Sequence, residues 1–511
     1  FSLDMNATLS YNKALNGHMI NALAGVSVKE DKSKANNATY IGFPSGTLSS
    51  PQYAKEMLQK TGFSESTKRL VGFLLSVNYS YQDIYLLDAS VRFDGSSTFG
   101  SDQRFAPFWS FGLGVNLHKY DFIQSLGFVN QLKVRASYGQ IGKANFPAYA
   151  ARSTYDIVTD EWYKTGISTR LKALGNKNLT WETTNTFDIG AELSLFNDLL
   201  YVKGAYDKRT IDLVNDVTVP TSTGFSSYRD NVGEISNKGY EFDVRVAACQ
   251  TKDWSVIFNF NLAHNKNRIE KISESLRAYN ERVQKMFEEN LMYNDPDRAL
   301  QTQPFLQYVE GGSMNSIFCV RSLGINPADG QEVFVSRNGQ LTKVWNASDQ
   351  VAVGTTEPKA QGTFGFNVAY KQFSLYTSFM YEGGGQRYNQ TLVDKVENVN
   401  VYTDNVDERV LTNRWTKPGD KAKYKSLVVG RDGVEDTKPT SRFVQDYNML
   451  SWNSFELGYD LPSGITSKLN LGMLRFSFSM NDILHLSTVK QERGTSYPFA
   501  RTVTFSIKAS L

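Results

Sequence analysis

The chain of 511 residues has few of the residue types that mark disulfide frameworks, metal centres or membrane-spanning helices. It has two cysteines, Cys249 and Cys319, which are too few for a disulfide framework or a cysteine metal site. Its four histidines show no metal-ligand spacing, so we expect no bound metal and no cofactor. A transmembrane helix needs an apolar run of about 18 residues or more. The sequence has no such run, which excludes a helical membrane protein.

Charge and motifs exclude two further classes. The formal net charge is +3, close to neutral for this length, so we expect no nucleic-acid partner. No Ser–His–Asp arrangement, glycine-rich phosphate loop or metal cluster rises above chance, so we expect no enzymatic activity.

What the chain has in abundance is alternation of apolar and polar residues, which is clearest at the C-terminus. A period of two predicts a β-strand with one apolar and one polar face. The apolar face comprises Val503, Phe505, Ile507, Ala509 and Leu511, and the polar face comprises Thr502, Thr504, Ser506, Lys508 and Ser510.

The same alternation recurs in segments of about ten residues, the length of a tilted strand that crosses a bilayer. The clearest segments are residues 85–94, 132–139, 187–195, 240–246 and 474–481, and the polar side of each of them includes full charges. The pattern predicts an outer-membrane β-barrel, whose apolar face meets lipid and whose polar face lines the lumen. The mean hydropathy of −0.39 is compatible with this prediction, because alternation hides the apolar face from the average.

The connections between the predicted strands alternate between short and long. Short turns face the periplasm in such barrels and long loops face outward. The short or moderate connections are expected at residues 16–17, 82–83, 118–130, 197–198, 251–253, 371–372 and 461–471. The long ones are expected at residues 31–66, 94–107, 141–182, 214–235, 266–360, 382–447 and 483–500.

This map contains roughly fifteen strands and places Cys249 at an inner strand end and Cys319 in an outer loop, too far apart for a disulfide. Residues 273–292 have apolar side chains at helical spacing, which predicts an amphipathic helix in an outer loop. The chain opens inside an alternating segment, so we expect a fragment or a processed piece.

Several stretches, in order from about residue 70 to the end, resemble the SusC-like (SusC/RagA) TonB-dependent transporters of Bacteroidetes. They are Asp88–Ser97, Gly175–Gly190, Asn231–Glu241, Arg414–Asp420 and Ser441–Phe443. Each stretch also suits a rim or loop-shaping role, which we favour over direct contact with a substrate.

The resemblance implies an all-β, transmembrane antiparallel β-barrel of about 22 strands in the whole protein, with long extracellular loops. Residues 1–511 would form the C-terminal part of this barrel, and the N-terminal plug and TonB box would lie outside the chain. It implies import of oligosaccharides or oligopeptides across the cell outer membrane, energised through TonB. The implied partners are a SusD-like surface lipoprotein over the extracellular loops, TonB, membrane lipid, and a glycan or peptide ligand.

Selective import requires binding groups on the lumen wall and the outer loops, and aromatic rings cover the flat faces of sugars. The expected substrate-binding residues are therefore loop aromatics, with packing of the loops as the alternative for each. They are Trp162, Trp345, Tyr402, Tyr308 and Trp415.

Three alternatives stay open at this point. The first is a siderophore or cobalamin receptor of the same architecture. The second is a soluble all-β glycan-binding or hydrolytic protein, in which Glu241 and Asp243 would be paired carboxylates rather than lumen-facing groups. The third is a passive porin or an adhesin.

Overall fold

The computed structural model describes the whole chain except residues 59–61, 101–102, 144–147, 150, 165, 174, 219–226, 273, 290–299, 400–405, 428–435, 491–500 and 511. The chain forms two compact units. The first comprises residues 1–115, 136–187 and 211–232, and the second comprises residues 116–135, 188–210 and 233–511.

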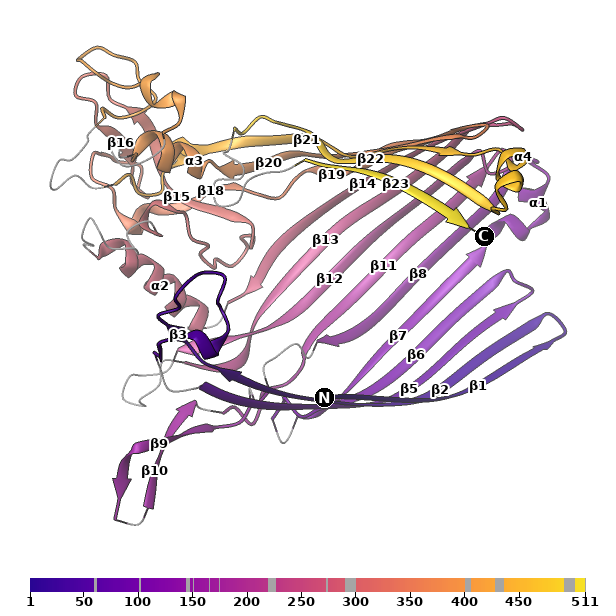
Figure 1. The fold of residues 1–511 in the computed structure, drawn as a ribbon, viewed down its shortest axis with the longest axis horizontal. Helices are drawn as coiled ribbons and strands as arrows, with labels where there is room; N and C mark the ends of the chain where they lie inside the picture. Colours follow the sequence, from indigo (N-terminus) through magenta and orange to yellow (C-terminus); the bar gives the residue numbers. More distant parts are fainter. Residues whose placement is uncertain are drawn as a thin grey trace. The chain divides into compact units, whose positions relative to one another are not determined.

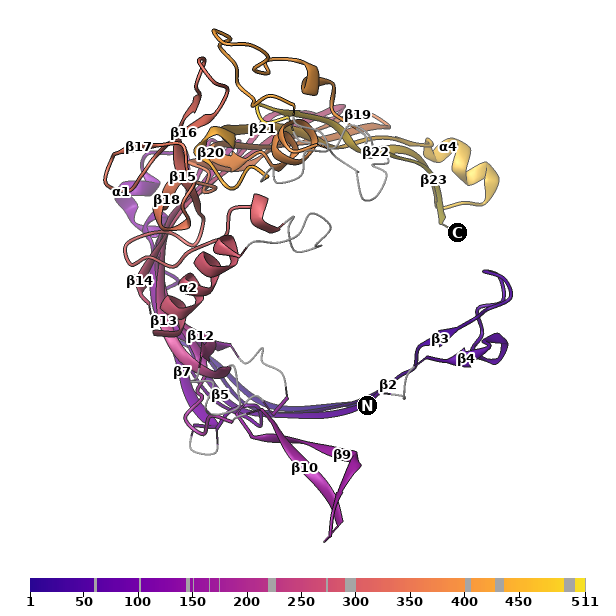
Figure 2. The ribbon, with the colours of Figure 1, turned by 90° about the vertical axis from the view of Figure 1, so that its left-hand side faces the viewer.

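Fifteen strands follow one another in chain order in one antiparallel sheet, which confirms the predicted strand number. They are β1 (Ser2–Leu15), β2 (His18–Asn37), β5 (Gly62–Tyr81), β6 (Tyr85–Ser96), β7 (Phe105–Asn116), β8 (Val129–Lys143), β11 (Glu182–Leu195), β12 (Leu200–Thr218), β13 (Ser227–Gln250), β14 (Trp254–Lys271), β19 (Ala360–Tyr370), β20 (Phe373–Tyr388), β21 (Val444–Asp460), β22 (Met473–Ser487) and β23 (Thr502–Ser510). Figure 2 shows β21, β22 and β23 side by side.

The remaining elements lie in the connections. The small sheets are β3 (Tyr40–Ile41) with β4 (Glu56–Met57), β9 (Thr154–Tyr163) with β10 (Gly166–Ala173), and β15 (Ser316–Ile325) with β16 (Glu332–Val335), β17 (Leu341–Thr342) and β18 (Gln350–Thr355). The α-helices are α1 (Asp121–Gln124), α2 (Glu274–Glu288), α3 (Gln390–Leu392) and α4 (Ser463–Thr466). Short turns of 3-10 type are η1 (Pro51–Tyr53), η2 (Leu117–Lys119), η5 (Ala347–Asp349), η7 (Glu408–Leu411), η8 (Ser441–Phe443) and η9 (Ser467–Leu469), and η6 (Val393–Glu397) is a π-helical turn. Among the described residues no helix is both long and apolar enough to cross a membrane.

Short and long connections alternate at most joints, but the connection 97–104, predicted as long, is shorter than the connection 117–128, predicted as short or moderate. In the first turn, Asn16 and Gly17 both have positive φ (49° and 82°), and Leu15 pairs with His18. This two-residue turn with positive φ at both positions matches the right-handed twist of its strands, and an Asn-Gly pair adopts it at low cost. The second short turn likewise has Gln82 and Asp83 at positive φ.

The strand register confirms the predicted alternation of faces. On one face of β22 and β23, Phe476 lies opposite Ile507 and Phe478 opposite Phe505, while Arg475 lies opposite Lys508 on the other face. In the first unit, the same holds for β5 and β6, where Phe73 faces Phe93. The outward rings and aliphatic chains are not covered by protein, since Phe505 is 78% exposed and Ile507 is 71% exposed.

The expected strand length of about ten residues is wrong for several strands. β2 and β5 have 20 residues each and pair over their full length, so 31–37 and 62–66, predicted as loop, belong to strands. The predicted loop 214–235 shrinks likewise, because β12 runs to Thr218 and β13 begins at Ser227. At about 3.3 Å per residue a 20-residue strand spans about 66 Å, well beyond a hydrocarbon core of about 30 Å. These strands therefore extend beyond the hydrocarbon core of the bilayer.

Candidate functional site: the loop assembly

The largest connections fold into an ordered structure, here called the loop assembly, defined as residues 272–359 and 389–443. It belongs to the second unit and contains α2, β15–β18, α3 and η5–η8. Figure 1 shows β15, β16, β18 and α3 gathered at one end of β20 and β21, whereas α4 lies at the opposite end. The assembly therefore stands at the mouth of the strands on the side of the long loops.

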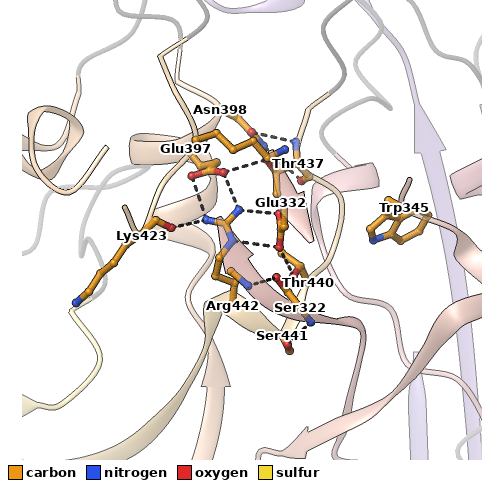
Figure 3. A network of polar contacts seen from close by, with 12 residues as sticks. Ser322, Glu332, Trp345, Glu397, Asn398, Lys423, Thr437, Thr440, Ser441 and Arg442 are labelled. Carbon is orange, nitrogen blue, oxygen red and sulfur yellow. Dashed lines mark hydrogen bonds and ion pairs between the residues drawn. The ribbon is translucent and has the colours of Figure 1, made fainter. Parts of the chain in front are cut away.

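At its centre Arg442 binds two buried carboxylates (Figure 3). Its Nη2 lies 2.8 Å from Glu332 Oε2 and 2.7 Å from Glu397 Oε1, and its Nε lies 3.1 Å from Glu332 Oε1. The Arg442 side chain is 10% exposed and each carboxylate is 1% exposed. Arg442 Nη1 donates to the backbone oxygen of Lys423 at 2.8 Å, so the fork of the guanidinium is fully used.

Hydroxyl and amide groups complete this network. Thr440 Oγ1 donates to Glu332 Oε1 at 2.7 Å, and Thr437 Oγ1 donates to Glu397 Oε1 at 3.4 Å. The backbone N–H of Ser322 donates to Ser441 Oγ at 2.9 Å. Since residues 322 and 332 belong to one long loop and residues 397–442 to another, the network joins the two loops.

The ionisation of the network follows from its burial and its charges. Burial raises the pKa of the Glu332 carboxyl, but the charge of Arg442 and the hydrogen bonds from Arg442 and Thr440 outweigh burial, so this pKa lies below its ordinary value. Burial lowers the pKa of Arg442, but Glu397 and Glu332 raise it further above its ordinary value. The pair therefore stays charged at neutral pH, and a fully hydrogen-bonded group of this kind holds segments together rather than performing acid–base chemistry.

The predicted amphipathic helix is confirmed as α2. Val283 and Phe287 on its apolar face are buried at 6% and 1% exposure, and they pack with Ala347 and the half-buried Trp345. A second apolar cluster forms around α3 and η6, with Leu392, Val393, Val396, Tyr424 and Phe443. The loop assembly thus has its own hydrophobic core.

Trp345, a predicted substrate-binding residue, lies in this core region. Its Nε1 donates to the backbone oxygen of Pro439 at 3.0 Å, its ring lies 5.3 Å from the ring of Phe287, and Lys438 Nζ lies 5.3 Å from its centroid. These contacts join the two long loops, and the ring is only half-buried. A role in substrate binding stays a prediction.

Trp415 and Tyr308, two more predicted residues, also make packing contacts. Trp415 Nε1 donates to the backbone oxygen of Pro327 at 3.0 Å, and the indole lies so close to Gly330 that a Cβ there would approach it to 2.5 Å. The Tyr308 ring meets that of Tyr279 edge-on at 5.4 Å, and its backbone is held by Asn280.

The side chains of the last two predicted residues lie outside the described part of the structure. Tyr402 lies outside the described residues. The backbone of Trp162 belongs to β9, paired opposite Ile167, and its side chain lies outside what the structure describes. The structure therefore places Trp345, Trp415 and Tyr308 in one assembly, and the side chains of Trp162 and Tyr402 lie outside what it describes.

The family-like stretches lie in strands as well as in loops, since Asp88–Ser97 lies almost wholly in β6 and Asn231–Glu241 lies in β13, whereas Arg414–Asp420 and Ser441–Phe443 lie in the loop assembly. In the first unit, Phe99, Leu179 and Trp181 form one buried cluster, and Gly100 lies so close to the Lys177 carbonyl that a Cβ there would approach its oxygen to 1.7 Å. In the loop assembly, Asp420 accepts hydrogen bonds from the backbone N–H groups of Thr416 and Lys417. Arg442 belongs to one of these stretches, but its buried carboxylate partners were not foreseen, because residues 332 and 397 are far from it in sequence.

Two recesses open in the loop assembly. One, of about 520 Å³, is lined mainly by polar residues of the β16–β17 turn and η5, including Arg337, Asn338 and Asp349. The other, of about 470 Å³, lies between residues 304–318, Thr356 and the end of β20, and both apolar and polar side chains line it. Both volumes fall within the range of about 300–1,000 Å³ typical of ligand sites. The two cysteines are free, and among the described residues no cluster of three acidic, histidine or cysteine side chains could hold a metal ion.

Comparison with known proteins agrees with this architecture. Residues 1–378 match the family model of the TonB dependent receptor-like β-barrel. TonB-dependent receptor P39 of Formosa agariphila is 28% identical over 93% of this chain and 48% of its own length. TonB-dependent receptor SusC of Bacteroides thetaiotaomicron is 27% identical over 53% of this chain and 28% of its own length. The chain thus spans about half, or less, of the length of the curated relatives it matches.

Among solved structures, the RagAB peptide transporter superposes with a TM-score of 0.78 at 23% identity, over 95% of this chain and 52% of that one, which shows the common fold. The outward apolar rows are accordingly the lipid-facing side of a barrel wall, so the soluble alternative is wrong. This chain is an outer-membrane protein and belongs to the TonB-dependent receptors, with sequence similarity to SusC.

Proposed function

We propose that the whole protein imports oligosaccharides or oligopeptides through the outer membrane, as the SusC-like component of a SusCD-type complex energised through TonB. The observation that supports this most is the loop assembly itself, with its own core and its buried Arg442 network. A passive pore needs no such structure, since a wide barrel is already open to small solutes. The similarity to SusC favours this function over import of a siderophore or cobalamin.

Energy coupling belongs, on this proposal, to a plug and a TonB box outside residues 1–511. The chain covers about half the length of its curated relatives, which leaves room for both in the whole protein.

A SusD-like lipoprotein would cover the loop assembly. Several apolar side chains of the assembly are strongly exposed, unlike those of its two core clusters. They are Leu323 (67%), Leu341 (64%), Val344 (73%) and Leu411 (87%). Exposed apolar groups outside the bilayer mark a protein interface, and a permanent one buries more than about 2,000 Å².

The cargo would contact aromatic rings of the outer loops. Trp345 and Trp415 each have their indole N–H bound to a proline carbonyl, which fixes the ring, and both side chains are half-buried. Trp162, Tyr308 and Tyr402 complete the proposed set.

Uptake and purification test the proposal together. Deletion of the gene should abolish growth on one class of oligomer, glycan or peptide, and loss of TonB should have the same effect. Gentle extraction from native outer membranes should yield the receptor with a surface lipoprotein. Growth that depends on iron or cobalamin supply instead, or purification of the receptor alone, would refute the SusCD-type assignment.

A further inference from the structure

The recess at the end of β20 has an apolar wall beside polar groups. Its lining includes Phe305, Met314, Asn315, Ser316, Thr356 and Arg387. Ile317 and Phe318 are each 5% exposed and lie at the bottom of the recess. Phe305 and Met314 are half-buried and form its accessible wall. Its volume of about 470 Å³ exceeds that of any single side chain and suits a short segment of ligand.

The polar groups at its rim are already bound within the protein. Asn315 Nδ2 donates to Glu357 Oε1 at 3.0 Å, and Thr356 Oγ1 donates to the backbone oxygen of Asn315 at 3.3 Å. Ser316 Oγ accepts from the backbone N–H of Ser313 at 3.3 Å. Asn315, Ser316 and Thr356 therefore have fewer donors and acceptors left for the several hydroxyl groups of a sugar ring.

Arg387 is different, because its side-chain contacts within the described part of the chain are a long ion pair with Glu382 and stacking on the Tyr447 ring. Its guanidinium lies 3.6 Å from the centroid of the Tyr447 ring, which fixes its plane. Its ion pair with Glu382 is long, with Nη2 at 3.7 Å from Oε2, and its side chain is 40% exposed. A guanidinium has five N–H donors in a planar fork that matches a carboxylate, so Arg387 can bind a second anion beside the apolar wall.

From this juxtaposition we infer that the recess binds the C-terminal residue of an oligopeptide. The apolar side chain of that residue would lie against Phe305 and Met314, and its carboxylate would pair with Arg387. This inference rests on the proposed import function and names the class of its cargo. A C-terminal residue is the part of a peptide that presents an apolar group and a carboxylate next to each other.

Direct binding to the receptor, purified in detergent from outer membranes with any lipoprotein that co-elutes, tests the inference. The probes are N-acetyl-Ala-Ala-Phe with a free carboxylate, the same peptide as its C-terminal amide, and maltoheptaose, measured by calorimetry. We expect the free acid to bind at least about tenfold more tightly than the amide, since a hydrogen bond to a charged group contributes at least that much. We expect no binding of maltoheptaose at this site.

Three variants locate the site. Arg387→Gln should remove the preference for the acid over the amide, and Met314→Trp, which fills the recess, should weaken both peptides. Arg282→Gln, the matched change on the exposed face of α2, should leave the affinities unchanged. Equal affinity for acid and amide, or absence of peptide binding, would overturn the inference. TonB-dependent uptake that persists in Arg387→Gln and Met314→Trp at the wild-type rate would overturn it while leaving the proposed import function intact.

Discussion

The strand wall and the loop assembly of the second unit solve the problem of burying apolar surface in opposite ways. In β23 the apolar row stays uncovered by protein, with Phe505 at 78% and Ile507 at 71% exposure. In the loop assembly two clusters of apolar side chains are buried within the protein, and Phe287 and Phe443 are each 1% exposed. The wall relies on lipid for its apolar environment, whereas the loops, which stand in water, must build a core and tie it together with a buried ion network.

The largest effect on the stability of the loop assembly relative to the wall is expected for Arg442→Met. The substitution leaves Glu332 and Glu397 buried without their cation, which should destabilise the loop assembly by about 3–5 kcal/mol. The wall, which contains no part of the network, should keep its stability. Hydrogen exchange followed by mass spectrometry should show lost protection in β16 and η6 and unchanged protection in β22. Equal protection in both regions before and after the change would show that the assembly does not depend on the network.

Reversing the polarity of a lipid-facing residue tests the other side of the comparison. Phe505→Lys puts a charge into the bilayer and should cost about 2–4 kcal/mol near its midplane. Thr504→Lys, one residue earlier on the polar face, is the matched control and should cost much less. Urea titration of the protein folded into vesicles measures both, and a larger cost at residue 504 would reverse the assignment of faces.

Acidification should loosen the loop assembly before the wall. The pKa of Glu332 is lowered in the folded state, so its stabilising contribution is present above its ordinary value of 4.5 and is lost as the pH falls through the lower, folded value. Hydrogen exchange at neutral pH and at about pH 3.5 should show a selective loss of protection in the assembly, smaller than that of Arg442→Met. In Glu332→Gln this pH dependence should be reduced.

Trp345→Ala separates binding from packing within the assembly. If the ring stacks on the cargo, affinity should fall by about 1–3 kcal/mol, a range measured for stacking of bases on aromatic rings. Trp415→Ala is the companion variant, since its indole makes an equivalent bond to a proline carbonyl. Calorimetry with the imported oligomer is the measurement, and unchanged affinity would assign Trp345 to packing alone.

The smallest effect is expected for an exposed ion pair. Arg268 and Glu270 lie 3.4 Å apart with 60% and 34% of their side chains exposed. Arg268→Gln should therefore change the free energy of unfolding by less than about 1 kcal/mol. Comparison with Arg442→Met would show that burial, and not the presence of an ion pair, gives the central network its effect.

The wall was predictable because its signal is local. Alternation with a period of two predicted the strand faces, and turn residues such as Asn16 and Gly17 predicted the tight connections. The strand lengths were underestimated, because the ends of β2 and β5 are polar and their pairing depends on each other rather than on alternation. The helix α2 was predicted for the same local reason, from its 3.6-residue period.

The site was predicted only in part. Loop aromatics stand out in a sequence, and Trp345 and Trp415 do lie in the loop assembly, but their proline carbonyl partners are 94 and 88 residues away. Glu332 looks like any other loop carboxylate, and its pairing with Arg442 spans 110 residues.

A one-dimensional pattern was thus sufficient to locate the strands of the wall and the face of each that meets lipid, but not the strand ends, because the face depends on the parity of positions whereas the ends depend on pairing. The meeting of Arg442 with two carboxylates, and of Arg387 with the recess at the end of β20, was decided when distant loops packed together. No local rule encodes such contacts, since they result from the closure of long loops whose ends are held by the wall.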